Sequence, residues 1–240
     1  MPNLLYLSIG LLLLQSCITT SEVGQEATTL PKHVFEIGAE AGIIKASGGM
    51  RYGLLNKIDV GAYYQINLQD NHIAFPGLST DFKWQLLGTP EKHFVFSSGL
   101  GFGTGIERTT LYNEDYYHSE EESIWMYGAT SLDAYLPLYF TFYLPQLGEH
   151  FFFNCNPYLI YRFGFYEWEY TGNSYQEGFW NYRPMKQLNG GTAFSIGASS
   201  KRSSFKVVLN ILLPTGHPEA YGNAELYATY GFRFNIKKDK

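Results

Sequence analysis

The last stretch of the chain, residues 224–236, alternates between apolar and polar positions. Its even-numbered positions, from Ala224 to Ile236, are apolar, whereas the odd-numbered positions include Glu225 and Arg233. Successive side chains of a β-strand point to opposite faces, so this period of two predicts a strand with two unlike faces. Similar alternation recurs along the chain and predicts ten strands, at 34–43, 49–55, 58–68, 73–87, 93–106, 123–144, 150–168, 191–199, 204–213 and 224–236.

The connections between these runs fall into two groups that alternate along the chain. Those of one group are short throughout, at 56–57, 88–92, 146–150 and 200–204. Those of the other group begin short and then lengthen, at 46–49, 69–72, 107–123, 169–190 and 214–222. Tight turns at one rim and long loops at the other are typical of an up-and-down antiparallel barrel. We therefore expect an all-β barrel of about ten strands over residues 33–236.

Alternation alone does not show which face of the barrel contacts water and which contacts lipid or the protein core. The polar face consists mostly of Gly, Ser, Thr, Asn and Tyr, and charged residues make up 16% of the chain, against about a quarter in a typical soluble domain. The apolar face carries aromatic residues near the short turns, among them Trp84, Phe94 and Phe232, as the aromatic girdle of a membrane barrel does. These features favour a transmembrane β-barrel with short periplasmic turns and long outer loops. A soluble barrel with core aromatics is the alternative.

The polar face then lines the lumen of the barrel. It carries residues of both charge signs: Glu36, Glu40, Arg51, Asp59, Asp81, Lys83, Arg162, Lys206, Glu225 and Arg233. Charges in such a place need partners, so we expect an ion-pair and hydrogen-bond network that largely fills the lumen. Barrels of about eight strands have interiors just wide enough for side chains to fill, and ten strands are only slightly more. The alternative is a narrow channel for small polar solutes.

The N-terminus has a different pattern. Residues 4–14 are apolar and end in Leu14-Gln15-Ser16-Cys17, a run of signal-peptide length that is too short for a membrane span. An aliphatic residue three positions before a cysteine and a small residue just before it resemble the lipobox of bacterial lipoproteins. The resemblance implies a signal peptide over 1–16 and lipidation at Cys17, and an ordinary secretory signal is the alternative. The polar residues that follow predict a flexible tether over 17–32.

The hairpin pattern, the GLGFGTG segment (99–105) and the aromatic closing strand that ends in FRFNI resemble the small outer-membrane β-barrel families of Gram-negative-type bacteria. The resemblance covers residues 33–236. It implies a location in the bacterial cell outer membrane, with membrane lipids as partners, and it implies no activity. The chain departs from these families at its end, where charged residues 237–240 form a tail in place of a terminal aromatic residue.

Two of the long connections carry candidate binding residues for an extracellular glycan or protein ligand. The first is acidic and holds Glu114, Asp115, Glu120, Glu121 and Glu122. The second is aromatic and holds Phe179, Trp180 and Tyr182, and exposed aromatics beside polar residues suit such binding. These residues could equally fold back over the barrel mouth. The acidic residues do not have the spacing of a calcium loop, so we expect no metal site.

The net charge and the absence of catalytic motifs exclude some classes of function but do not identify one. The net charge is −5 and no Lys/Arg stripe is present, which argues against nucleic-acid binding. No HExxH or GxSxG motif is present, and we expect neither an enzyme nor a cofactor. We therefore expect a structural or surface-interaction role, with the narrow channel, an outer-rim hydrolase and a soluble lipid-anchored barrel that binds an apolar ligand as alternatives. The sequence leaves the oligomeric state open.

Overall fold

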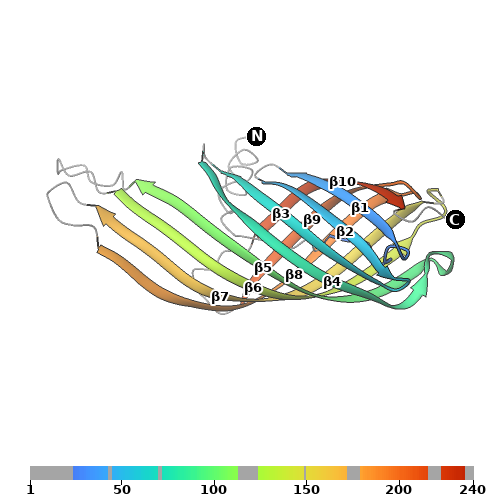
Figure 1. Cartoon of the computed structure of the whole chain (residues 1–240), viewed down its shortest axis with the longest axis horizontal. Coiled ribbons are helices and arrows are strands. Elements are labelled where there is room, and N and C mark those ends of the chain that lie inside the picture. The colour runs from blue at the N-terminus through green and yellow to red at the C-terminus, as the bar shows by residue number, and fades with distance from the viewer. Residues whose placement is uncertain are drawn as a thin grey trace, which may run out of the picture.

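The computed structural model describes residues 24–42, 45–69, 72–112, 124–148, 150–171, 179–215 and 223–235. Ten antiparallel strands form a closed barrel in which each strand pairs with its neighbours in the chain and the first pairs with the last (Figure 1). The strands are β1 (Val34–Gly42), β2 (Lys45–Leu55), β3 (Ile58–Gln69), β4 (His72–Thr89), β5 (Phe94–Tyr112), β6 (Ile124–Tyr143), β7 (Phe151–Thr171), β8 (Phe179–Ser199), β9 (Ser203–Thr215) and β10 (Asn223–Asn235). The predicted ten-stranded, up-and-down barrel is confirmed.

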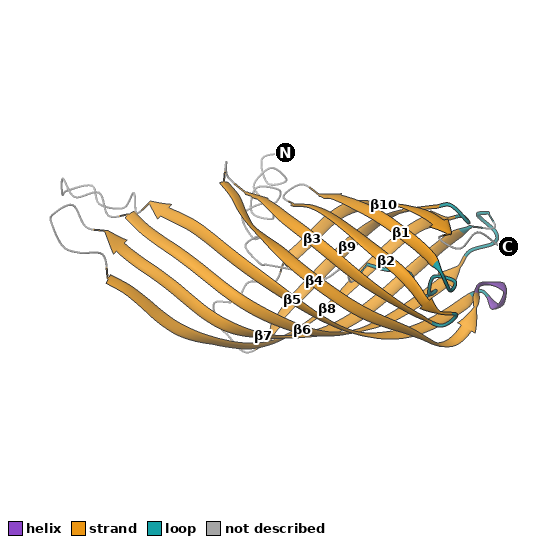
Figure 2. Cartoon of the chain, in the orientation of Figure 1, coloured by secondary structure: helices purple, strands orange, loops and turns teal. Residues whose placement is uncertain are grey.

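The two rims of the barrel differ. The turns between β2 and β3, β4 and β5, β6 and β7, and β8 and β9 gather at one end, which we call the turn rim (Figure 2). The β4–β5 turn contains the 3-10 helix η1 (Pro90–Lys92). The opposite end, the loop rim, receives the remaining connections, which lie outside the described residues. In the described part of the chain, no helix is long and apolar enough to cross a membrane.

The strands are unequal in length. Strands β1 to β3 have 9 to 12 residues, whereas β5 to β8 have 19 to 21. The four long strands project beyond the others on the loop-rim side (Figure 1). A tilted strand needs about 9–11 residues to cross the hydrocarbon layer. The barrel therefore carries a one-sided wall, made of the loop-rim parts of β5 to β8, that is longer than one membrane span requires.

The predicted connection at 169–190 is wrong, because β7 continues to Thr171 and β8 already begins at Phe179. The sequence FWNYRPMKQLNG at 179–190 does not alternate in hydropathy, so the pattern gave no strand signal there. This part of β8 is a strand because it pairs with β7. The register of the two strands is continuous from Phe179 opposite Tyr170 to Ala198 opposite Phe151. The connection predicted at 107–123 is also shorter than expected, since β5 ends at Tyr112.

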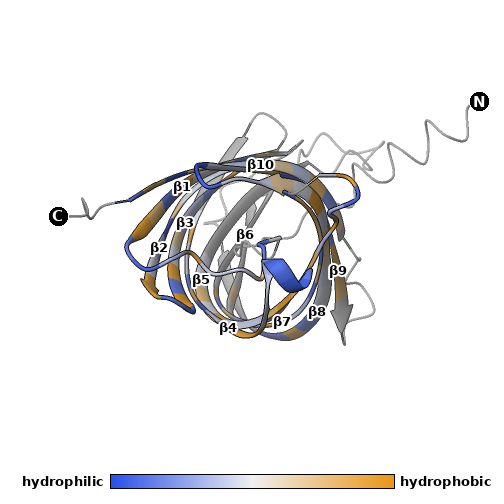
Figure 3. Ribbon diagram, turned by 90° about the vertical axis from the view of Figure 1, so that its right-hand side faces the viewer, coloured by the Kyte–Doolittle hydropathy of each residue, from blue (hydrophilic) through white to orange (hydrophobic). Residues whose placement is uncertain are grey.

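The two faces of the barrel wall lie as the alternation predicted. On β10, Leu226, Tyr230 and Phe232 are 50–55% exposed on the outside. Tyr227 and Thr229, at the positions between them, are 2% and 8% exposed and face inward. Large apolar side chains are exposed in the same way on all ten strands, and the strands close into a ring when viewed from the turn rim (Figure 3). The barrel therefore has an apolar outer surface and a polar interior.

Inward-facing tyrosines cover inward-facing glycines on the adjacent strand. Tyr135 of β6 lies opposite Gly101 of β5, and a Cβ placed on that glycine would be 2.0 Å from the tyrosine ring. Tyr158 covers Gly191 in the same way between β7 and β8, with a ring atom 2.3 Å from the corresponding position. An aromatic ring over a cross-strand glycine fills the space that the missing side chain leaves. The glycine-rich segment around Gly101 thus packs the interior of the barrel.

Pro157 lies within β7 and causes no register shift in the β6–β7 pairing. The β6–β7 pairing has the same register before and after it, from Pro137 opposite Tyr158 to Phe140 opposite Cys155. Proline has no N–H to donate to the ladder. Beside it, the side chain of the preceding residue makes a cross-strand contact, because Oδ1 of Asn156 accepts a 3.1 Å hydrogen bond from the N–H of Phe140.

Candidate functional site

The interior of the barrel is the candidate functional site. All ten charged residues predicted for the lumen lie on the inward face, and each is buried or half-buried. They divide into groups. One group gathers on β2, β3 and β4, and another lies at the seam between β1 and β10, whereas Arg162 lies apart on β7. Glu225 is half-buried on β10, close to the loop rim.

Four charged residues form the largest group, which we call the lumen charge cluster: Arg51, Asp59, Asp81 and Lys83. The guanidinium group of Arg51 binds Asp59 and lies 2.5 Å from both carboxylate oxygens of Asp81. Nζ of Lys83 is 3.5 Å from Asp59. All four side chains are at most 6% exposed. Two cations and two anions balance, and this mutual pairing stabilises charges that would be very unfavourable alone in a buried site.

Arg162 binds a residue that the sequence analysis did not predict. Its Nε and Nη2 donate hydrogen bonds of 2.8 Å to the two carboxylate oxygens of Asp133, which lies directly opposite on β6. Such bidentate pairs are stronger and more specific than single contacts. Asp133 lies between the apolar residues Leu132 and Ala134 in the sequence. This alternation places it on the inward face and could have identified it as a lumen residue.

The seam between β1 and β10 carries a third group. Glu36 lies opposite Arg233 in the register and accepts a hydrogen bond from its Nε. Nη2 of the same arginine is 3.5 Å from Glu26, which precedes the barrel in the chain. This arginine therefore ties the closing strands of the barrel to the N-terminal segment.

The chain before β1 enters the lumen. The described part of the predicted tether, residues 24–32, runs toward the turn rim, from Gln25 beside Asp81 to Thr29, which binds Asn56 of the β2–β3 turn. Gln25, Ala27, Thr29 and Leu30 are at most 5% exposed. Nε2 of Gln25 donates a 2.8 Å hydrogen bond to Asp81 of the lumen charge cluster. The prediction of a flexible tether is therefore wrong for these residues. Its polar, non-alternating sequence gave no sign that its binding partners lie far along the chain.

Residues 24–30, which we call the plug segment, bind several strands at once. Ala27 is wholly buried, its N–H donates a 2.7 Å hydrogen bond to Oγ1 of Thr141 and its carbonyl accepts one from Ser97. Nζ of Lys83 donates to the carbonyls of Glu26 and Thr28 at 2.9 and 3.2 Å. The segment therefore satisfies polar groups of the barrel wall in the turn-rim half of the lumen.

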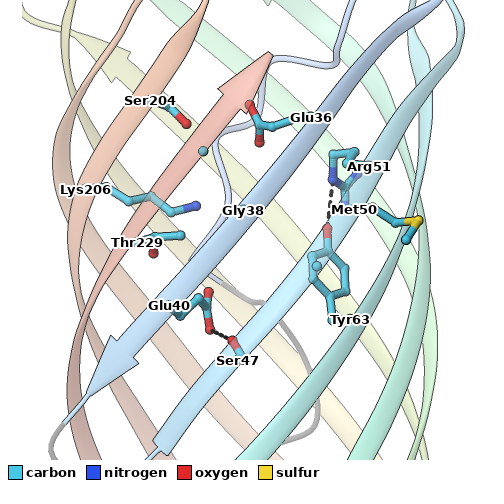
Figure 4. Close-up of a pocket in the computed structure, with 12 residues that line it drawn as sticks. Glu36, Gly38, Glu40, Ser47, Met50, Arg51, Tyr63, Ser204, Lys206 and Thr229 are labelled. Carbon is cyan, nitrogen blue, oxygen red and sulfur yellow. Dashed lines mark hydrogen bonds between the residues drawn. The ribbon is translucent and has the colours of Figure 1, made fainter. Parts of the chain in front are cut away.

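A small cavity remains beside the plug segment, against β1, β2, β9 and β10 (Figure 4). Its lining includes Glu36, Glu40, Ser47, Lys206 and Thr229. Oε2 of Glu40 accepts a 2.6 Å hydrogen bond from Ser47, whereas Oγ1 of Thr229 is buried without a hydrogen-bond partner among the described residues. The cavity volume is about 30 Å³, room for one or two water molecules. The cavity has a mixed polar and apolar lining and is too small for an organic solute.

The described structure covers only some of the predicted outer-loop residues. The acidic residues Glu114, Asp115, Glu120, Glu121 and Glu122 lie outside the described residues, as does Cys17. Phe179, Trp180 and Tyr182 belong to β8 rather than to a loop. The described part of the chain contains no group of three or more His, Cys, Asp or Glu residues that could hold a metal ion.

No known family model matches the chain, and no curated protein matches it. Several solved structures resemble it. The outer-membrane protease OmpT from Escherichia coli is 11% identical, with a TM-score of 0.51, over 88% of this chain and all of that chain. The N-terminal β-barrel domain of OprF from Pseudomonas aeruginosa is 13% identical, with a TM-score of 0.38, over 85% of this chain and all of that domain. At this identity the likeness to OmpT concerns the fold alone, and the chain has the fold of an outer-membrane β-barrel.

Proposed function

We propose that the chain is an outer-membrane barrel with a structural or surface-interaction role, whose lumen is closed to solutes by its own plug segment. The observation that carries this proposal is the position of residues 24–30, which are hydrogen-bonded to inward-facing groups of β3 to β7. The lumen charge cluster and the Asp133–Arg162 pair occupy further interior space. The cavity against β1, β2, β9 and β10, of about 30 Å³, is too small to hold an organic solute.

The outer surface supports the membrane location. Apolar side chains such as Leu132, Leu159 and Leu209 are 40–50% exposed. A continuous apolar band around a protein is stable when lipid covers it, and a closed barrel has no strand edge that lipid would leave unpaired. Bacterial outer membranes hold barrels of this kind, with an even number of antiparallel strands.

The one-sided wall supports the surface role. The loop-rim parts of β5 to β8 are longer than a membrane span needs, so they extend beyond the bilayer in this proposal. They carry Phe179, Trp180 and Tyr182 in β8, and the acidic residues at 114–122 belong to the adjoining connection. An extracellular glycan or protein ligand for this wall stays a prediction, and so does the absence of enzymatic activity.

Export and anchoring belong to the same proposal. The signal-like residues 1–16 and Cys17 would deliver the chain to the outer membrane as a lipoprotein. Replacing Cys17 by Ala should abolish the incorporation of labelled fatty acid in growing cells, and Cys155→Ala is the matched control that should leave it unchanged. Equal labelling of the Cys17→Ala variant would contradict lipidation at this residue.

Conductance in planar lipid bilayers tests the closed lumen. The full chain should give no discrete conductance steps, whereas a variant without residues 24–30 should give them. Lys201→Ala, a change at an exposed turn residue, should behave as the full chain does. Discrete steps from the full chain would contradict the closed lumen. Silence from the deletion variant, once it is shown to be folded by heat-modifiable migration, would contradict the role of the plug segment.

A further inference from the structure

The plug segment is bound largely through its main chain. Each residue from Gln25 to Leu30 contributes at least one main-chain atom to a hydrogen bond with the barrel. At the two ends, the carbonyl of Gln25 accepts a 2.8 Å bond from Asn156, and the N–H of Leu30 donates a 2.9 Å bond to Asp59. Contacts of this type depend weakly on side-chain identity, because every residue has the same main-chain groups.

The barrel supplies matching groups from successive strands. The side chains that bind the main chain of the segment are Asp59, Lys83, Gln85, Ser97, Thr141 and Asn156, from β3 to β7. Ser97, Thr141 and Asn156 are wholly buried. Buried polar groups without partners are unfavourable by about 1–3 kcal/mol each. These groups therefore form a preformed site for the main chain of a polypeptide segment.

Side-chain size matters at the position of Ala27. Ala27 is 0% exposed and packs in a cluster with Val95 of β5 and Tyr139 of β6. Its carbonyl and N–H are both bonded to the wall, so the residue cannot shift to make space for a larger side chain. Main-chain hydrogen bonds combined with a pocket for one side chain are a recurring mode of peptide recognition.

We propose that the turn-rim half of the lumen is a binding site for a short polypeptide segment, that residues 25–30 are its resident ligand, and that it is selective for a small residue at the position of Ala27. This goes beyond a closed lumen, because it assigns the interior a ligand class that can bind in trans. The proposal does not depend on the barrel sealing a membrane.

Peptide binding in detergent tests this proposal. The probe is a fluorescent peptide with the sequence of residues 24–31, and the receptor is the barrel without residues 18–31, folded in detergent micelles. Fluorescence anisotropy should show saturable binding to this variant and not to the full chain, whose own segment occupies the site. A full-length Ala27→Trp variant, which should expel its own segment, provides a second receptor if the deletion variant folds poorly.

Changes in the peptide separate main-chain from side-chain recognition. N-methylation at Leu30, which removes the donor to Asp59, should weaken binding on the order of tenfold. N-methylation at Thr28 is the control, because its N–H makes no hydrogen bond with the described residues. A peptide with Ser at the position of Ala27 should bind within a few-fold of the parent, whereas a peptide with Trp there should not bind.

Two results would overturn the proposal. One is the absence of saturable binding to either receptor after folding is shown by heat-modifiable migration. The other is equal binding of the parent peptide and the peptide N-methylated at Leu30. Neither result bears on conductance, so this proposal and the closed lumen can fail separately.

Discussion

Asn156 donates a 2.8 Å hydrogen bond from Nδ2 to the main-chain carbonyl of Gln25, which lies 131 residues earlier in the chain. The same side chain accepts a hydrogen bond from the N–H of Phe140, where Pro157 interrupts the β6–β7 ladder. One buried amide on β7 therefore binds both the plug segment and strand β6.

Replacing Asn156 by Ala should lower the stability of the barrel by about 2–4 kcal/mol, because two buried main-chain groups would each lose a partner. The measurement is urea unfolding in detergent micelles, followed by heat-modifiable migration. Lys201→Ala is the control for an exposed residue and should leave the midpoint unchanged. Equal midpoints for the two variants would show that the amide is dispensable.

Arg162→Leu should destabilise the barrel by about 3–5 kcal/mol, since it leaves the Asp133 carboxylate buried without its bidentate partner. The double variant Asp133→Leu/Arg162→Leu should recover much of that loss, because it removes both buried charges. Urea unfolding of the two single variants and the double variant forms a double-mutant cycle. Additive effects of the two substitutions would contradict a coupled pair.

Gly101→Ala should destabilise the barrel by about 1–3 kcal/mol, the usual effect of overpacking. The new Cβ would lie 2.0 Å from the ring of Tyr135, and the ring would have to move. Gly38→Ala is the matched control, because the nearest atom to its Cβ is the carbonyl oxygen of Tyr230 at 3.5 Å. Thermal unfolding of both variants should separate them, and a larger loss for Gly38→Ala would refute the packing argument.

Leu159→Arg tests the lipid-facing surface. Leu159 is 50% exposed on the outer face of β7, and a cation near the middle of the bilayer costs about 2–4 kcal/mol. Folding into lipid vesicles should be reduced accordingly. Leu147→Arg, at a leucine that is 62% exposed beyond the end of β6 at the turn rim, should fold as well as the unaltered chain. Equal folding of the two variants would contradict a lipid-covered outer face.

The fold was predictable from the sequence wherever one strand face is apolar and the other polar. Strand β6, predicted at 123–144, is observed at Ile124–Tyr143 despite its internal Pro137. The prediction failed in the first half of β8, because the residues after Phe179 do not alternate and strand pairing alone sets their conformation.

The lumen was only partly predictable. Alternation placed Arg51 and Asp81 on the inward face. It did not predict that they pair, because the pairing depends on how three strands are staggered. The plug segment was not predictable from local sequence. Its residues lack periodicity, and Gln25 is positioned by Asp81 and Asn156, which are 56 and 131 residues away.

The pairing of β1 with β10 has a consequence for the order of folding. These strands join Val34–Gly42 to the end of the barrel, opposite Tyr227–Asn235. Contacts between such distant parts of a chain form late, because closing a long loop is entropically unfavourable. The plug segment directly precedes β1, and we expect it to enter the interior while the seam is still open. Closure of the seam then traps the segment, and its later exit would require reopening the seam or withdrawal along the barrel axis.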